Sequence, residues 1–267
     1  MEFLNREKAP ISTEVWSVID GELEELLAKR LKLRSVVDFD ESFSFETDAI
    51  PTGKLAKISS KNGTTICARE PISMVEMRYD FDLPKTVIDE IKRGLEDFDN
   101  EVLQKAANEF AVAENSMILD GIKKANITGL LESMEHKPIA ASSSKEMLAA
   151  TAKALEIFDD SFVEGGFKIV VSNQTFSKLV VETVGAMSVK HKIEQLLGQN
   201  SIIVSNAVGN DKALVISQRG GDYKFYSGFD VSVGFEKENK DSISLFLTES
   251  AAFRVLSPEA SIVINIS

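Results

Sequence analysis

Few side chains in this 267-residue sequence have the type and spacing that enzyme chemistry requires. The two histidines, His136 in MEHKP and His191 in KHKIEQ, stand among charged residues without metal-ligand spacing around them. Because Cys67 is the single cysteine, the chain can form neither an internal disulfide nor a thiolate metal cluster. The sequence therefore predicts solvated histidines and no metal site.

No loop or acidic cluster in the sequence indicates catalysis either. HExxH, GxSxG and a glycine-rich phosphate loop are missing, and Gly220-Gly221 in SQRGGDY is predicted to be a hairpin turn between two strands. The acidic runs in the first helix and in LEDFDNE near Leu95 are typical of solvated helix faces. A Ser-His-Asp triad is defined by geometry, and no motif marks one. We expect a protein that is not an enzyme and holds no cofactor.

Charge and hydropathy indicate the class of partner and the compartment. The 30 basic and 42 acidic residues give a net charge of -12, which repels phosphate and disfavours nucleic-acid binding. Charged residues interrupt the first twenty positions, and no stretch of about 18 apolar residues could span a bilayer. With its lone cysteine, the chain is predicted to be a cytoplasmic protein without a membrane partner.

The N-terminal third is predicted to contain one helix and one extended arm. Apolar residues recur at helical spacing from Val15 to Leu31, and Ser12 can cap this helix, which is predicted to reach about Ser35. Residues 43–79 read as extended chain with Asn62-Gly63 as a type I′ turn. Because a lone hairpin is marginal in water, the arm must lie against its own body or a neighbouring subunit.

The remaining two thirds predict an α+β fold. A short helix precedes Gly94, a long spine helix covers 98–124, and Ser143 with Glu146 forms a capping box before another helix. Strands and helices alternate from residue 166 to residue 218. Four strands are then expected, in YKFYSGFDVSVGF, SISLFLTES, AAFRVLS and ASIVINIS.

Three blocks of the sequence carry a family resemblance: MEFLNREKAP with Trp16 and Ile19-Asp20, then ITGLLES, and then the stretch from SQRGGDY to SPEA. Taken in order, these blocks resemble the linocin-like encapsulins. The resemblance implies the tailed-phage major capsid protein fold of the Hong Kong 97 type, with an extended β-hairpin loop, a peripheral domain and an axial domain. The implied boundaries are 1–42 for an N-terminal helix and inner-wall segment, 43–80 for the extended loop, 81–137 and 221–267 for the peripheral domain, and 138–220 for the axial domain.

The resemblance also implies a function. Members are shell subunits that self-assemble into an icosahedral nanocompartment, here of the smallest, T=1, size, and encapsulate a cargo enzyme through its C-terminal targeting peptide. Cargo classes in the family are ferritin-like proteins, which store iron, and peroxidases, which act in oxidative stress. The implied cargo-peptide-binding residues are Leu27, Leu31, Arg34, Val36, Asp38, Asp230, Val231 and Phe253. The implied five-fold pore residues, which form an uncharged constriction, are Gly185, Ala186, Met187 and Ser188.

Some assignments have alternatives. Leu27 and Leu31 could be core, Arg34 and Asp38 could form an exposed i,i+4 pair, and Asp230 could cap a turn. The pore segment could be a helix–helix turn. Some encapsulins stack a flavin on a tryptophan in the stretch matching FDLPKTVID, but this chain has Pro84, Lys85 and Thr86 there, so no flavin is expected. The alternative functions are a prophage major capsid protein that packages nucleic acid, and a protease or bacteriocin.

Overall fold

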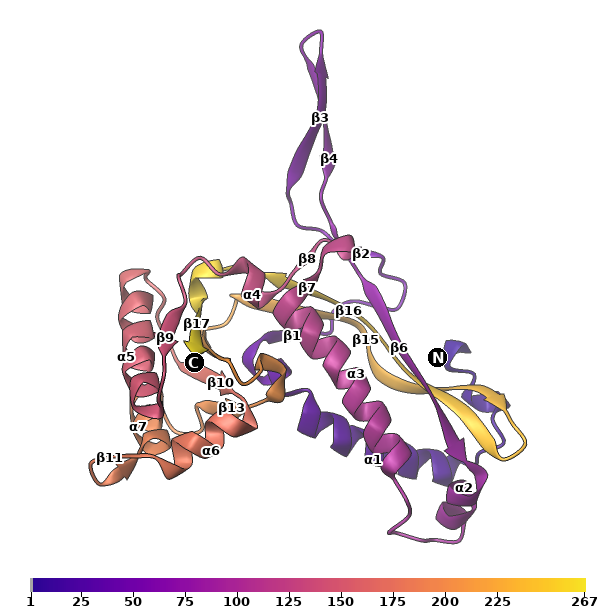
Figure 1. Ribbon diagram of the computed structural model, residues 1–267. Coiled ribbons are helices and arrows are strands. Elements are labelled where there is room, and N and C mark those ends of the chain that lie inside the picture. The colour runs from indigo at the N-terminus through magenta and orange to yellow at the C-terminus, as the bar shows by residue number, and fades with distance from the viewer. Residues whose placement is uncertain (1) are drawn as a thin grey trace.

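The computed structural model describes residues 2–267, and Met1, the first residue of the predicted N-terminal segment, lies outside them. The fold is α+β and has two lobes, each built on its own β-sheet (Figure 1). The long lobe has a four-stranded sheet in the order β1 (Asp38–Asp40), β15 (Tyr223–Glu238), β16 (Ser242–Val255) and β6 (Val75–Pro84). The compact lobe has a five-stranded sheet in the order β13 (Ile202–Val204), β10 (Phe167–Val171), β14 (Lys212–Ser217), β17 (Ser261–Ile266) and β9 (Ile139–Ala141).

The helices divide between the two lobes. Those of the long lobe are α1 (Thr13–Arg30), α2 (Lys85–Lys92), α3 (Glu101–Asp120) and α4 (Leu130–Ser133), and those of the compact lobe are α5 (Ser144–Asp160), α6 (Asn173–Val181) and α7 (Val189–Leu197). Short 3-10 helices are η1 (Glu2–Leu4), η2 (Arg6–Lys8), η3 (Lys32–Val36), η4 (Lys123–Ala125), η5 (Asn206–Val208) and η6 (Pro258–Ala260). The remaining strands pair in twos: β2 (Ala49–Ile50) with β5 (Ile72–Ser73), β3 (Leu55–Lys61) with β4 (Thr64–Arg69), β7 (Gly121–Ile122) with β8 (Ile127–Thr128), and β11 (Thr183–Val184) with β12 (Met187–Ser188).

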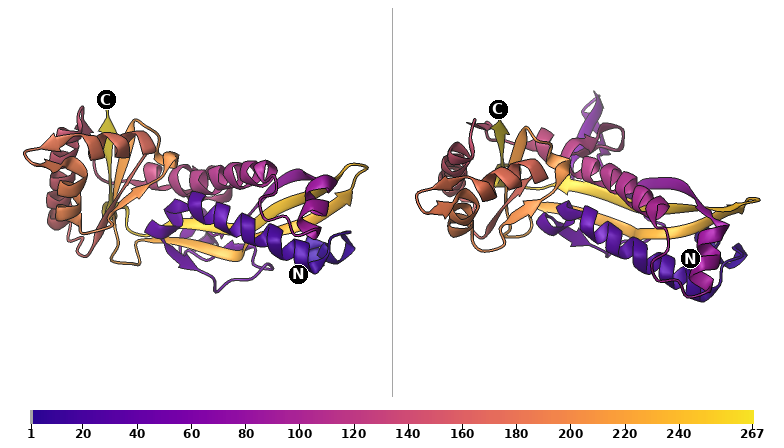
Figure 2. Two further views of the ribbon diagram at one scale, coloured as in Figure 1. Left: turned by 90° about the horizontal axis from the view of Figure 1, so that it is seen from below. Right: turned by 60° about the horizontal axis from the view of Figure 1, so that its bottom comes forward.

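Helix α1 follows the predicted apolar spacing. Val15, Ile19, Leu23 and Leu27 recur every fourth residue, so they share one face, and all four are buried against α3 and the sheet of the long lobe. Figure 2 shows α1 and α3 running along the length of that sheet. The helix ends at Arg30 and not near Ser35, because Leu31 leaves the helical conformation and η3 follows.

Two strand assignments differ from the sequence prediction. SISLFLTES and AAFRVLS belong to a single strand, β16, which pairs with β15 and β6 along most of its length. Residues 261–266, predicted to lie with the spine helix, form β17 in the compact lobe, between β14 and β9. Alternating polarity marks a strand but not its partner, so the sequence pattern could not assign β17 to a sheet.

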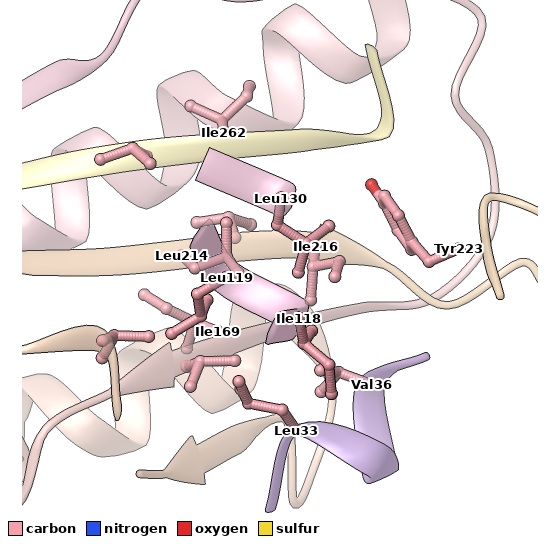
Figure 3. Close-up of a cluster of buried hydrophobic side chains, with 14 of the residues drawn as sticks. Leu33, Val36, Ile118, Leu119, Leu130, Ile169, Leu214, Ile216, Tyr223 and Ile262 are labelled. Atoms are coloured by element: carbon pink, nitrogen blue, oxygen red, sulfur yellow. The ribbon is translucent and has the colours of Figure 1, made fainter. Parts of the chain in front are cut away.

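The two lobes share a core (Figure 3). Leu33 and Val36 from η3 and Ile118 from α3 pack beside Ile169 of β10 and Ile216 of β14. Burial of these side chains holds the lobes together, since apolar burial contributes about 25 cal/mol per Å². The junction is therefore part of the folded core.

The Arg219–Asp222 turn, RGGD, crosses the junction between the lobes. Gly220 and Gly221 both have a φ of +82°, a conformation that glycine adopts without strain. The prediction of a hairpin is wrong, because the turn joins β14 to β15 and these strands lie in different sheets. Arg219 donates from Nε to both carboxylate oxygens of Asp222 at 3.1 Å and from Nη1 to the carbonyl of Phe162 at 3.1 Å. This turn therefore ties the two lobes to each other.

Strands β3 and β4 form the predicted arm, which projects away from both lobes (Figure 1). Asn62 and Gly63 have φ values of +51° and +79° at its tip, which confirms the turn predicted there. The predicted cap at Ser143 is also confirmed, since its hydroxyl accepts from the Glu146 backbone N at 3.2 Å. The Glu146 carboxylate accepts from the Ser142 backbone N at 2.7 Å and not from that of Ser143, so only half of the capping box forms. β6 begins at Val75, inside the segment predicted as extended loop, and pairs with β16 in the sheet.

Candidate binding groove

A groove with a volume of about 460 Å³ lies between α1 and β15. Apolar residues of α1 form one wall, β15 with Leu247 of β16 forms the other, and charged side chains stand at its rim. The lining residues are Arg6, Asp20, Leu23, Glu24, Leu27, Ala28, Leu31, Arg34, Asp230, Val231, Ser232, Val233 and Leu247. An apolar cleft of this size with a few polar groups is the usual form of a ligand site.

The structure brings together five of the eight residues predicted to bind a cargo peptide. Leu27, Leu31, Arg34, Asp230 and Val231 all line the groove. Leu27 and Leu31 also belong to the core of the long lobe, so the alternative assignment to the core holds for them as well.

The other three predicted residues lie elsewhere. Val36 and Asp38 line a separate cavity of about 50 Å³ beside the RGGD turn. Asp38 does not pair with Arg34 but accepts a hydrogen bond from the Gly221 backbone N at 2.5 Å. Phe253 is fully buried on β16, near the base of the arm.

Eight of the lining residues were not predicted from the sequence, although a local pattern marks six of them. Asp20, Leu23, Glu24 and Ala28 extend the face of α1 that bears Leu27, because residues three and four apart are neighbours on a helix. Ser232 and Val233 directly follow the predicted Asp230 and Val231 on β15. Arg6 and Leu247 have no such signal, since only the tertiary structure places them beside α1.

Arg34 lies at one end of the groove and is held by three carboxylates. Its Nε donates to Oε1 of Glu114 at 2.9 Å, and its Nη2 donates to Glu114 Oε2 at 2.5 Å and to Glu249 Oε1 at 2.8 Å. Its Nη1 donates to Asp230 Oδ1 at 2.8 Å. A guanidinium has five N–H donors, so one donor of Arg34 remains for a ligand.

The electrostatics of this cluster follow from burial. Glu114 and Glu249 are fully buried, while Asp230 is exposed over 53% of its side chain. Burial raises the pKa of Glu249 well above its usual range, and the charge of Glu114 raises it further, while Arg34 lowers it. Its Oε2 has no hydrogen-bond partner among residues 2–267. Burial lowers the pKa of Arg34, but the hydrogen bond and charge of Glu114 outweigh this effect and raise it above the ordinary value.

The N-terminal segment closes the other end of the groove. Arg6 Nη2 donates to Asp20 Oδ2 at 2.6 Å, and the Arg6 guanidinium lies 4.1 Å above the Trp16 ring. Cation–π contacts of this kind contribute about 0.5–1 kcal/mol at exposed sites. Arg6 therefore holds η2 against α1.

The predicted pore residues form a small hairpin. Gly185 and Ala186 turn between β11 and β12, and Gly185 has a φ of +69°. The hairpin connects α6 to α7 at the end of the compact lobe farthest from the long lobe (Figure 1). The segment is thus a two-residue β-turn rather than the direct helix–helix turn considered as the alternative.

The residues considered for a cofactor, a metal ion or catalysis do not come together. Pro84 ends β6 and Lys85 begins α2, while Trp16 is buried in α1 beneath Arg6. His136 Nε2 lies 2.9 Å from the Glu259 carbonyl, and His191 is exposed on α7. Across residues 2–267, no group of three His, Cys, Asp or Glu side chains is arranged to hold a metal ion. Within the same range, every helix is too short or too polar to cross a membrane.

Curated relatives match the chain from end to end. A shell protein from Brevibacterium linens, named a type 1 encapsulin shell protein, is 29% identical over 268 residues and covers 100% of both chains. One of the same name from Rhodospirillum rubrum is 30% identical over 271 residues and covers 98% of this chain and 96% of its own. Both are named as structural proteins, in agreement with the prediction that this chain is not an enzyme.

Solved structures show the fold. The virus-like particle from Pyrococcus furiosus matches with a TM-score of 0.67 at 18% identity, covering 95% of this chain and 100% of its own. The capsid of Myoviridae phage XM1 matches with a TM-score of 0.53 at 12% identity, and the match covers 88% of this chain and 91% of the phage chain. The fold is therefore that of the tailed-phage major capsid proteins of the Hong Kong 97 type.

The family model Linocin_M18, described as the encapsulating protein for peroxidase, matches residues 1–252. This match runs from η1 into β16, and therefore includes the groove between α1 and β15, the arm, and the compact lobe except for β17. Together with the two relatives, it shows that the chain belongs to the encapsulin shell proteins.

Proposed function

We propose that copies of this chain close into an icosahedral T=1 shell in the cytoplasm and that the shell holds a cargo enzyme. The family membership supports assembly, and the free arm supports a contact between copies, because a two-stranded hairpin is marginal in water by itself. Many identical heterologous contacts close by symmetry, so the subunit needs no chemistry of its own to enclose a volume. In this proposal, the long lobe with its spine helix forms the peripheral domain and the compact lobe the axial domain.

The groove between α1 and β15 is the proposed cargo-binding site, and its shape is the observation that carries the proposal. Leu27, Leu31 and Val231 offer apolar surface for the aliphatic side chains of a C-terminal targeting peptide. Asp230 and the one free donor of Arg34 orient the peptide from the end of the groove. Val36, Asp38 and Phe253 are left out of the proposed site because they do not line the groove.

A peroxidase is the cargo class that the family description supports, since the family model is named for encapsulating one. An iron-storing ferritin-like protein is the other class. The net charge of -12 opposes packaging of nucleic acid. The β11–β12 hairpin, with uncharged residues from Thr183 to Ser188, is the proposed lining of the five-fold pore.

Sedimentation and negative-stain imaging of the purified protein test the proposed assembly. We expect uniform closed particles whose ultraviolet absorbance shows protein without nucleic acid. Abundant packaged DNA would instead identify a capsid protein, and material that stays monomeric or dimeric at physiological salt contradicts the proposal.

Cargo loading is tested by co-expression with a dye-decolourising peroxidase, with and without its C-terminal targeting peptide. We expect peroxidase activity to sediment with the shells only when the peptide is present. Empty shells are the control and should show no proteolytic or peroxidase activity. Equal loading of the truncated peroxidase contradicts a peptide-binding role for the groove.

A further inference from the structure

The arm exposes apolar side chains that its own lobe does not cover. Leu55 and Ile58 on β3 and Ile66 on β4 are exposed over 65%, 66% and 54% of their surface. The arm projects from the long lobe where β2 and β5 pair, and Figure 1 shows it extending away from both lobes. A hairpin with this surface needs a second body to cover it.

The arm is also basic, although the chain as a whole is acidic. Residues 51–71 contain Lys54, Lys57, Lys61 and Arg69 against the single acid Glu70, a net charge of +3. Since the whole chain carries -12, the rest of it carries -12 - 3 = -15. Among residues 2–267, none of these four cations is in an ion pair. The surface that covers the arm should therefore be acidic.

An acidic surface without ion pairs lies between α2 and α3. Glu96, Asp97, Asp99 and Glu101 are exposed, no basic residue lies between Gly94 and Gln104, and none of the four acids has an ion-pair partner in the described part of the chain. Leu95, in the same segment, is exposed over 41% of its surface. Residues 95–101, called the acidic segment below, thus combine apolar and negative surface, as the arm combines apolar and positive surface.

The arm and the acidic segment lie at opposite ends of α3. The acidic segment leads into the N-terminus of α3, while the arm leaves the lobe near β7 and β8, which follow its C-terminus (Figure 1). A helix of 20 residues is about 30 Å long at 1.5 Å per residue. One copy therefore cannot bring its own arm onto its own acidic segment. A second copy can, and such a head-to-tail contact is heterologous, the kind that closes into rings.

We infer that the arm of one copy docks on the acidic segment of a neighbouring copy. Lys54, Lys57 and Lys61 face the carboxylates of the acidic segment, and the apolar residues of the arm cover Leu95. This inference rests on the proposed assembly and adds to it the surface that receives the arm and the charge that selects it. Opposite charges on two such surfaces accelerate encounter by about 10–10³-fold, and salt screens the effect.

Charge reversal on each side tests the inference. The triple variant Lys54→Glu, Lys57→Glu, Lys61→Glu and the triple variant Glu96→Lys, Asp97→Lys, Asp99→Lys should each assemble at least about tenfold more slowly than wild type at 0.1 M salt, followed by light scattering. A chain that carries all six changes should recover most of the wild-type rate. The matched control is Lys54→Arg, Lys57→Arg, Lys61→Arg, which keeps the charge and should assemble normally.

Two controls separate folding and salt effects from docking. Far-ultraviolet circular dichroism of each variant should match wild type, because all six positions are exposed. Wild-type assembly should slow toward the rates of the triple variants at 1 M salt, where the screening length falls from about 10 Å to about 3 Å. Normal assembly of either triple variant, or no recovery in the six-fold variant, overturns the inference. Failure of the wild type itself to assemble contradicts the proposed function instead.

Discussion

Arg34 and Glu114 are joined by two parallel hydrogen bonds, from Nε to Oε1 at 2.9 Å and from Nη2 to Oε2 at 2.5 Å. The two residues are 80 positions apart, and their pair connects η3 at the end of the groove to the spine helix α3. The contact is almost entirely out of solvent, since the Arg34 side chain is 18% exposed and that of Glu114 is fully buried. Arg34 is therefore a structural support of the groove as well as part of its lining.

Replacing Arg34 with Met should strongly destabilise the subunit. The change leaves the buried Glu114 without the cation that pairs with it and removes the donor to Glu249, a loss of about 3–5 kcal/mol for a broken buried pair. We expect the thermal unfolding midpoint to fall by about 10 °C, measured by calorimetry. The control is Lys29→Met, which removes an exposed pair with Glu25 and should change little. Equal midpoints for the two variants contradict the structural role of Arg34.

Glu249 should make stability fall as pH rises. Its pKa is raised in the folded protein by burial and by Glu114, so the folded state holds a proton that the unfolded chain releases at its ordinary carboxyl pKa. The contribution of Glu249 to the free energy of unfolding is therefore fully present below its pKa in the unfolded chain, and it is lost as pH rises through its pKa in the folded protein. The Glu249→Gln side chain stays neutral, so the thermal unfolding midpoint of this variant should depend less on pH than that of wild type between pH 5 and pH 9. An unchanged slope in this variant assigns the pH dependence to other groups.

Filling the groove from α1 should block cargo without harming the fold. Ala28 lines the groove and is exposed, so Ala28→Trp adds a large side chain where a peptide backbone would lie. We expect intact shells with at least about tenfold less co-purified peroxidase, as an occluded hydrophobic site loses a few kcal/mol of affinity. Lys29→Trp, one position along the helix and outside the groove, is the control and should load normally. Wild-type loading of the Ala28 variant contradicts the assignment of the groove.

Arg219 should stabilise the subunit through its hydrogen bonds to the buried carboxylate of Asp222, which is 3% exposed. Arg219→Gln removes the guanidinium that donates to both Asp222 oxygens and to the Phe162 carbonyl. A buried acceptor that loses its partner costs about 1–3 kcal/mol, so the unfolding midpoint should fall by about 2–10 °C. Lys237→Gln on the exposed end of β15 is a comparison that should leave the midpoint in place. A similar midpoint for both changes means that the turn is not a support of the junction.

The sequence predicted the features of this structure that depend on residues close together in the chain. Asn62-Gly63 predicted the tip of the arm because few other pairs adopt two positive φ values, and Ser143 with Glu146 predicted the start of α5. The apolar spacing of α1 predicted its buried face. Each of these signals lies within about one helical turn of the feature that it predicts.

Features that depend on distant partners could not be predicted in this way. Two of the three carboxylates that hold Arg34, those of Glu114 and Glu249, are 80 and 215 positions away in the sequence, and no local pattern links them to Arg34. Phe253 was predicted to face the groove, but β16 is one long strand that places it in the core. The pairing of β17 with β14 and β9 could not be predicted for the same reason, because contacts between distant parts of the chain decide to which sheet a strand belongs.

The place of β17 in the middle of its sheet has a consequence for biosynthesis. Residues 261–266 insert between β14 and β9, so the compact lobe stays incomplete while the ribosome still holds them. Newly made chains therefore cannot present a finished subunit surface to one another before translation has passed this strand. The order of synthesis therefore delays completion of the compact lobe until β17 has been made, which keeps chains that lack this strand out of a growing particle.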